Sequence, residues 1–340
     1  MAKLRGLNLS KYSIYIILVV VFIAASFLSP NFLTGSNMIN IPRQLAVTTI
    51  LGFGAMMLII SGMIDLSAGS VLALSGVMSI VAFKATDSLI VAMIVAILIG
   101  VICNLINAVM CATFGVPPFI ATLAMSMVAR GLVLLYTQGQ NVLQLGRFTV
   151  FGQGSIGPIP IPVIFLVLAT IAIGYMMTQT RFGRALYAIG GNQEAARASG
   201  INVTRTKYQA FLINGVLVGL AGLLFMSRVN AGLPNGAVGY EMEGITSAIV
   251  GGTSFTGGVG TTMGTLAGSF IIGLLNNIMN LTGVGSYVQQ ITKGVIIAVA
   301  VIYDIRSKRS RKTRVILKEA ENVSPDTTVD PQMVGGTTTN

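Results

Sequence analysis

Residues 89–114 read LIVAMIVAILIGVICNLINAVMCATF and contain no Asp, Glu, Lys or Arg. A helix of about 20 apolar residues crosses the hydrocarbon core of a bilayer, so this run is long enough to span a membrane. The whole chain shares this character, because 54% of its 340 residues are hydrophobic and only 9% are charged. Soluble proteins carry about 25% charged residues. The sequence therefore predicts an all-α, polytopic transmembrane helical bundle.

Ten segments have this character, and two of them need comment. The segments are 12–29, 44–63, 66–85, 89–114, 117–136, 160–178, 208–229, 244–256, 259–281 and 286–303. The first is interpreted as an uncleaved helix, because the basic residues Lys3, Arg5 and Lys11 precede an apolar run that no clean small-residue cleavage site follows. The eighth, GITSAIVGGTSFT, is too short and glycine-rich for an ordinary span, so we expect a broken helix packed inside the protein.

The distribution of Lys and Arg predicts the orientation. Residues 1–11 carry three, 181–207 carry five and 306–318 carry seven of the 21 basic residues. Basic segments stay on the cytoplasmic side, which places both termini and the 179–207 loop inside and the 137–162 loop outside. This parity requires the eighth segment to cross as well, and eight full spans plus irregular pieces is the alternative. The predicted membrane domain is 12–306, between a short cytoplasmic tail (1–11) and a basic, then disordered, cytoplasmic tail (307–340) to which we assign no role.

Two polar intervals interrupt the apolar segments. The outer one, TQGQNVLQLGRFTVFGQGSIGPIPIP (137–162), is long and rich in Gly and Pro, and its apolar residues predict a packed cap or a docking surface. These residues are Val142, Leu143, Phe148, Val150 and Phe151. The inner one is RFGRALYAIGGNQEAARASGINVTRTK (181–207).

The inner interval contains a predicted helix over Gln193–Ser199, which Asn192 caps and Gly200 ends. A short helix outside the bilayer, between two spanning helices, has little to pack on within its own chain. We therefore expect this helix to have a partner.

Several kinds of chemistry are excluded by residue type. The chain has no His, and Cys103 and Cys111 would lie about 12 Å apart on one helix, too far for a disulfide. We therefore expect neither a metal site nor thiol chemistry. The run 257–264, GGVGTTMG, does not fit a phosphate-binding loop, because it lacks the GxxxxGK[ST] pattern and a preceding strand.

Energy for pumping would therefore have to come from another subunit or an ion gradient. No nucleophile–base–acid set is visible, which argues against an intramembrane enzyme. The net charge of +11 is explained by topology and by anionic lipid headgroups, so we expect no nucleic-acid partner.

Polar residues in the apolar segments each have two interpretations. Asp65, with Ser67 and Ser70 nearby, either shapes a helix junction or contacts a solute or proton. A group of asparagines either lines a path for a hydroxylated solute or makes inter-helix hydrogen bonds: Asn104, Asn107, Asn276, Asn277 and Asn280. For Arg130, Arg228 and Lys293, an internal ion pair or a snorkelling side chain is expected rather than catalysis.

Glycines recur at the spacing that lets membrane helices approach closely. One ridge is Gly260, Gly264 and Gly268, and a similar one is Gly215, Gly219 and Gly222. Both are interpreted as packing within one bundle, with a contact between subunits of a dimer as the alternative.

Five motifs occur together in one order along the chain. They are GMIDLSAGS (62–70), PFIATL (118–123), TRFGR (180–184), AIGGN followed by EAARASGINV (188–192 and 194–203), and GGTSFTGG (251–258). With them the chain, over about residues 12–306, resembles the permease subunit of bacterial ABC sugar importers of the ribose, galactose and xylose type.

The resemblance implies a mechanism and partners. Two permease copies, expected as a homodimer, would form the pore in the inner membrane. A soluble sugar-binding protein would dock outside and an ATPase, binding ATP and Mg²⁺, would dock inside. Glu194, Ala195, Ala196 and Gly200 match the coupling motif of the family. Arg181 and Arg184, in the preceding TRFGR motif, are expected to take part in the same coupling to the ATPase.

The function expected from the resemblance is import of a monosaccharide, ribose or a related pentose or hexose, by a subunit without its own cofactor or enzyme activity. The alternatives are another polyol or sugar derivative in the same architecture, a self-sufficient carrier or channel, and, least favoured, a membrane enzyme.

Overall fold

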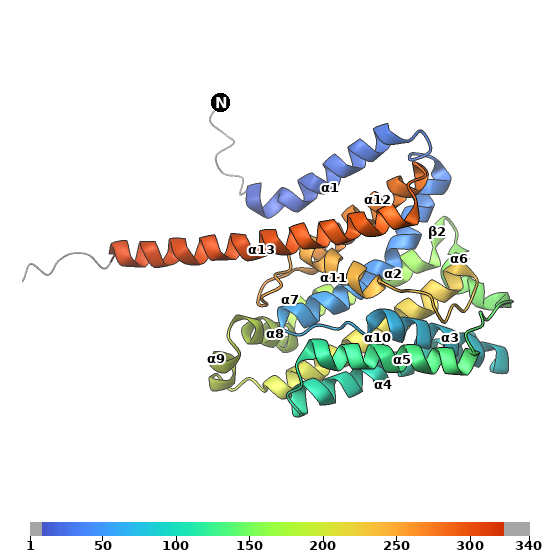
Figure 1. Ribbon diagram of the computed structural model, residues 1–340, viewed down its shortest axis with the longest axis horizontal. Helices are drawn as coiled ribbons and strands as arrows, with labels where there is room; N and C mark the ends of the chain where they lie inside the picture. The colour runs from blue at the N-terminus through green and yellow to red at the C-terminus, as the bar shows by residue number, and fades with distance from the viewer. Residues whose placement is uncertain (1–8, 323–340) are drawn as a thin grey trace, which may run out of the picture.

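The chain forms a helical bundle in a computed structural model that describes residues 9–322 (Figure 1). The first helices are α1 (Leu9–Leu28), α2 (Gly35–Ile60), α3 (Ala68–Thr86), α4 (Leu89–Ala108), its π-helical continuation η1 (Val109–Thr113) and α5 (Pro118–Thr137). A connection follows with η2 (Gly146–Thr149), α6 (Val150–Gln153) and a hairpin of β1 (Ser155–Ile156) and β2 (Ile159–Pro160). The rest comprises α7 (Ile161–Gln179), α8 (Arg181–Gly191), α9 (Gln193–Ala198), α10 (Val203–Val229), α11 (Tyr240–Val250), α12 (Thr262–Leu281) and α13 (Ser286–Asn322).

Each predicted segment overlaps a helix, which confirms the polytopic helical fold. Within the described residues, seven helices are long and apolar enough to cross a membrane: α2, α3, α4 with η1, α5, α7, α10 and α12. Shorter apolar stretches, Ser13–Leu28 and Ser286–Ile302, lie in α1 and α13. The number of crossings and the side on which each terminus lies remain predictions. The predicted tails fall partly on residues 1–8 and 323–340, outside the described part.

The eighth segment is a broken helix, as predicted, but it begins earlier than expected. α11 has 11 residues and starts directly after Gly239, which has a φ of 86°. Residues 251–261, of which the second half of the predicted segment forms part, make an irregular connection instead, with Gly252, Gly257 and Gly258 at positive φ. Glycine adopts this conformation without strain, so these residues end the helix and begin the loop.

Two helices form the centre of the bundle. The most apolar 18-residue windows of α2 and α10 are 78% buried, whereas those of α4, α5 and α7 are only 28% buried. A helix that faces lipid can remain apolar on its outer side, which explains why α4 is the most hydrophobic helix yet is mostly exposed.

Both glycine ridges contact helices of the same chain. A Cβ on Gly215 or Gly219 would overlap backbone atoms of α4, and one on Gly264 or Gly268 would overlap backbone atoms at the end of α11. The close approach therefore depends on the missing side chains. These contacts agree with packing inside one bundle.

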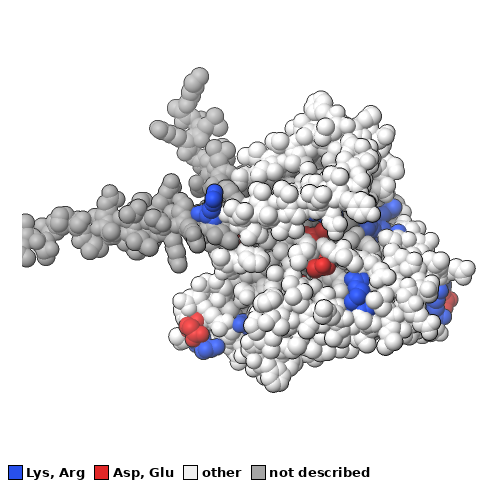
Figure 2. Space-filling view, viewed as in Figure 1, with Lys and Arg blue, Asp and Glu red and all other residues white. Residues whose placement is uncertain are grey.

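The two ends of the bundle differ in structure. α8 and α9 lie at one end and α6 with the β hairpin at the other, while α13 continues beyond the bundle on the α8–α9 side (Figure 1). Charged side chains gather near these ends and in a small central group, and most of the visible face is uncharged (Figure 2). At the hairpin end the connection packs as a cap, since Phe148 is buried and the Phe148 ring lies 5.8 Å from that of Phe83 and 5.9 Å from that of Phe151.

Candidate translocation and coupling sites

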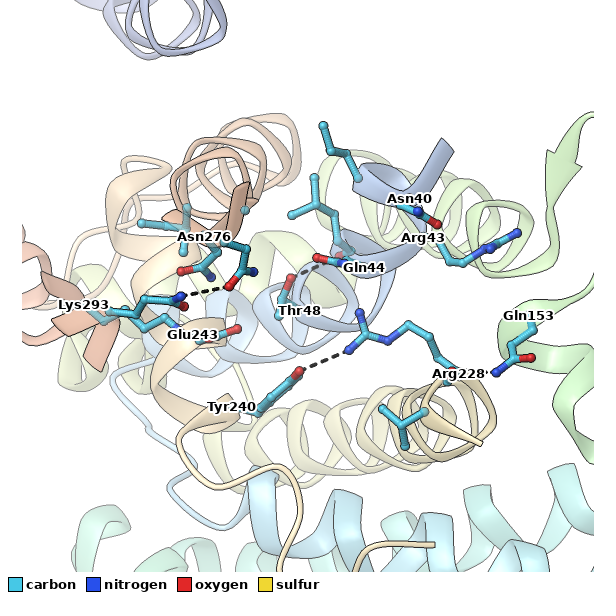
Figure 3. Close-up of a pocket in the computed structure, with 17 residues that line it drawn as sticks. Asn40, Arg43, Gln44, Thr48, Gln153, Arg228, Tyr240, Glu243, Asn276 and Lys293 are labelled. Carbon is cyan, nitrogen blue, oxygen red and sulfur yellow. Dashed lines mark hydrogen bonds and ion pairs between the residues drawn. The ribbon is translucent and has the colours of Figure 1, made fainter. Parts of the chain in front are cut away.

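A polar cavity of about 730 Å³ lies between the ends of α2, α10, α11, α12 and α13 that are distant from α8 and α9 (Figures 1 and 3). Its charged lining residues are Arg43, Arg228, Glu243 and Lys293, and its amides are Asn40, Gln44, Gln153, Asn276, Asn280 and Gln289. Tyr240 and Thr48 add hydroxyl groups, and Leu45, Ile272 and Gly273 add apolar surface. The cavity therefore offers hydrogen-bond donors and acceptors beside an apolar wall.

Charges in this cavity are only partly paired. Lys293 and Glu243 form an ion pair that joins α13 to α11 (Figure 3). Nη2 of Arg228 lies 3.3 Å from the hydroxyl oxygen of Tyr240, and its guanidinium carbon lies 5.7 Å from the centroid of the Phe225 ring. Within the described residues, neither Arg43 nor Arg228 forms an ion pair. Three cations against one carboxylate leave the lining net positive.

Three atoms of the lining residues are buried and have no hydrogen-bond partner within the described part of the chain. They are Nε of Arg43, Nε of Arg228 and Oδ1 of Asn276. A buried polar group without a partner is costly, about 1–3 kcal/mol, so each such group calls for an explanation. Because these atoms have almost no exposed surface, an ordered water inside the protein would satisfy them.

Asp65 lies in a separate buried cluster. Its Oδ1 accepts a hydrogen bond from the Ser67 backbone N–H at 2.8 Å, and its Oδ2 accepts one from Nδ2 of Asn214 at 2.7 Å. Asn214 Nδ2 also donates to Oδ1 of Asn104 at 2.9 Å, and Asn107 Nδ2 donates to the Ser67 hydroxyl at 3.0 Å. These contacts join the α2–α3 connection to α4 and α10, which favours the junction-shaping interpretation of Asp65.

The remaining predicted path residues are divided among different places. Ser70 pairs with Ser126 across α3 and α5 at 2.8 Å. Asn277 is buried and exchanges hydrogen bonds with Asn37 at 2.8 and 3.1 Å, whereas its neighbour Asn276 lines the cavity. Successive helix residues point about 100° apart, which is why two adjacent asparagines have different surroundings. Of the asparagines predicted from the sequence, Asn276 and Asn280 line the cavity.

Reasoning from the sequence did not identify most of the cavity. Arg43, Gln44, Tyr240 and Glu243 belong to segments assigned to membrane helices or their ends, and no motif connects them. The available signal was the presence of charge within apolar segments, which drew attention to Arg228 and Lys293. Lys293 forms the expected internal ion pair, but its partner Glu243 lies 50 residues away in sequence. Arg130 instead donates to the backbone carbonyls of Pro234 and Gly236.

The predicted cytoplasmic helix forms α9, and its ends follow the predicted signals. The side chain of Asn192 accepts from the Ala195 N–H at 3.0 Å, and Gly200 follows the helix with a φ of 81°. Glu194 and Ala195 are exposed, whereas Ala196 is buried. Most of this helix therefore presents its surface to solvent.

The prediction that α9 has little to pack on is wrong in one respect. Ala196 packs in a small cluster with Ile189 of α8 and Val203 of α10. The sequence did not predict α8, because its three glycines lower helix propensity and obscure the pattern. The Thr180 hydroxyl caps α8 by accepting from the Gly183 N–H at 3.2 Å. Arg181 and Arg184 lie exposed on this helix.

α8 also contacts the connection between α11 and α12. The Tyr187 hydroxyl donates to the Gly260 carbonyl at 2.8 Å, and burial raises the pKa of Tyr187, so the hydroxyl keeps its proton. The Gly258 N–H donates to the Ile60 carbonyl at 2.9 Å, and a Cβ on Gly190 would overlap that carbonyl. Asp304 of α13 accepts from the Ser254 hydroxyl and the Phe255 N–H. A movement of α8 would thus displace α2 and the 251–261 connection, and through that connection α11, α12 and α13.

The bundle, its polar cavity and the α8–α9 unit define a polytopic membrane protein of the transport class. A family profile described as "Branched-chain amino acid transport system / permease component" matches residues 37–302. The chain therefore belongs to this family of transport permeases. It is a multi-pass protein of the inner membrane, in agreement with its apolar helices.

Several curated relatives are similar over most of their length. The chain is 40% identical to the ribose import permease protein RbsC of Bacillus subtilis (strain 168) over 290 residues, which are 84% of this chain and 90% of that protein. It is 39% identical to the ribose import permease protein RbsC of Escherichia coli (strain K12) over 294 residues, 85% and 92% of the two chains. It is 37% identical to the D-allose transport system permease protein AlsC of Escherichia coli (strain K12) over 297 residues, 86% and 91%. These findings confirm the resemblance to sugar-importer permeases.

Proposed function

We propose that this chain is the membrane permease subunit of an ATP-driven ABC importer, and that it moves a monosaccharide, ribose or a related pentose or hexose, into the cytoplasm. The observation that carries the proposal is the similarity to permeases whose names specify ribose and D-allose, at 37–40% identity over most of both chains. Another sugar or polyol in the same architecture is the principal alternative.

The proposed partners are those of an ABC importer, and the exposed surfaces suit their docking. The ATPase, which would bind ATP and Mg²⁺, docks on α8 and α9, where Glu194, Arg181 and Arg184 are exposed. A soluble sugar-binding protein docks on the cap formed by residues 137–162 at the opposite end, where Leu143 and Ile156 are exposed. A second copy of the chain completes the pathway.

Solute uptake by the complete importer tests the proposed substrate class. Vesicles holding the permease, its ATPase and the binding protein would be supplied with ATP and labelled D-ribose, D-allose or L-leucine. L-leucine is included because the description of the family names branched-chain amino acids. We expect a sugar to enter and L-leucine to remain outside. Uptake of L-leucine without uptake of any sugar would overturn the proposal.

A further inference from the structure

We propose that the cavity between α2, α10, α11, α12 and α13 is the outer solute chamber of the permease, and that its chemistry selects a neutral polyhydroxylated solute over a cation or an amino acid. This assignment rests on the proposed function and names the residues that would distinguish between solutes. These residues include Arg43, Arg228 and Asn276, which line the cavity.

The side chains of these three residues match the groups of a sugar. The two guanidinium groups donate hydrogen bonds and the amide of Asn276 both donates and accepts, as each hydroxyl of a sugar does. A site built from such groups rejects a solute that lacks the hydroxyls, because the polar atoms of the site then remain unpaired. Ile272 and Leu45 provide an apolar wall for the C–H face of a ring.

The charges disfavour other solutes. The lining has three cationic side chains and one carboxylate, so a cationic solute would be repelled. The ammonium group of an amino acid would lie close to these cations, and the one carboxylate in the lining, Glu243, already pairs with Lys293. A branched-chain amino acid would in addition place an apolar side chain against many amides. The chamber therefore fits a sugar better than the solute in the family description.

The helices that line the chamber also extend to the α8–α9 end of the bundle. α2, α10, α11 and α12 each contribute one end to the lining, and their opposite ends lie near α8 and α9 (Figures 1 and 3). Ile60, at the far end of α2, contacts both α8 and the connection to α12. A displacement of α8 would therefore alter the walls of the chamber.

The first test removes the acceptor while keeping its approximate size. Asn276→Leu, in the complete importer, is expected to lower the maximal rate of D-ribose uptake about tenfold. ATP hydrolysis should continue, because α8 and α9 are unchanged, so that more ATP is consumed per sugar. Asn31→Leu, at an exposed position between α1 and α2, is the matched control and should transport normally. Normal ribose uptake by Asn276→Leu would overturn the assignment.

The second test does not depend on losing a buried amide. Thr48→Cys places a thiol in the chamber, while the natural Cys103 and Cys111 are buried. A membrane-impermeant methanethiosulfonate applied from outside should label the introduced thiol and block ribose uptake. The anionic reagent should react faster than the cationic one, relative to the same ratio at Asn31→Cys, because the lining is net positive.

The outcomes separate the assignment from the proposed function. If the unmodified importer carries no sugar, the proposed function fails. If it carries ribose and a labelled Thr48→Cys protein carries it equally well, or if the cationic reagent reacts preferentially, the chamber assignment alone fails. A variant that does not reach the membrane is replaced by Arg43→Met, for which the same loss of ribose uptake is expected and normal uptake counts against the assignment.

Discussion

Asp65 is an acidic residue that has a structural role inside this membrane protein. Its two carboxylate oxygens receive hydrogen bonds from Ser67 and Asn214, and Asn104 and Asn107 extend the cluster to α4. A polar group in the bilayer interior is costly unless it is satisfied. Both carboxylate oxygens of Asp65 are satisfied within the protein, which fits a structural part better than a place on an open path. The cluster lies outside the lining of the chamber.

Replacement of Asp65 tests this interpretation. Asp65→Ala leaves the donors of Ser67 and Asn214 without their acceptor, so we expect the protein in detergent to lose about 2 kcal/mol or more of stability. The measurement is the midpoint of denaturant-induced unfolding, with Asn31→Ala at an exposed position as the control. Unchanged stability combined with lost transport would instead support direct contact of Asp65 with the solute.

Among the helices, α8 contains two adjacent glycines that differ in their contacts with the rest of the bundle. A Cβ on Gly190 would overlap the Ile60 carbonyl and approach the Gly258 backbone, whereas a Cβ on Gly191 would meet nothing within 4 Å. Gly190→Ala should therefore displace the 251–261 connection, and Gly191→Ala should not.

The pair is compared by measuring ribose uptake and ATP hydrolysis in the same vesicles. We expect Gly190→Ala to lower the sugar moved per ATP at least about tenfold, as a mispositioned element can. Gly191→Ala should behave as the wild type. Equal coupling in both variants would show that this contact does not transmit the signal.

The exposed surface of α9 yields a separate prediction about the ATPase. Glu194 has a side chain that is 74% exposed and an ion pair with Arg197 at 3.4 Å, which contributes little to stability. Glu194→Arg should therefore insert and fold normally but weaken docking of the ATPase, because reversed charge disrupts a complementary interface.

Co-purification of the ATPase with the permease measures this effect, and Glu194→Gln, which keeps the size but not the charge, should lose less of it. Wild-type amounts of bound ATPase in Glu194→Arg would show that α9 is not the docking helix.

Elements could be predicted where local sequence determines them. Long apolar runs located the helices, and Asn192 and Gly200 marked the ends of α9, because caps act within a few residues. α8 was missed, since its helix depends on packing of Leu186 and Ile189 against the bundle rather than on propensity. The chamber was also missed. Its lining combines six helices, α6 included, and whether Asn276 or Asn277 faces it depends on tertiary contacts.

For the whole molecule, the predicted topology places the chamber outside and α9 inside. The described helices provide a surface for each end, and the net basic charge of 181–207 and 306–318 favours the cytoplasm for α9 and the end of α13. Alternating access would then arise from α8 acting on the far ends of the helices that line the chamber.

Labelling from each side of the membrane tests this orientation. In right-side-out vesicles an impermeant thiol reagent should modify Thr48→Cys but not Ser199→Cys, and in inverted vesicles the order should reverse. Labelling of both positions from the same side would contradict the ten-segment topology.

The energy source of uptake tests the proposed ABC importer most directly. Labelled D-ribose would be supplied with a saturating amount of the binding protein to vesicles that hold the permease and its ATPase. We expect uptake only when ATP is present on the side of α8 and α9, and none when the permease alone is given a proton or sodium gradient. Gradient-driven uptake by the permease alone would contradict the proposal.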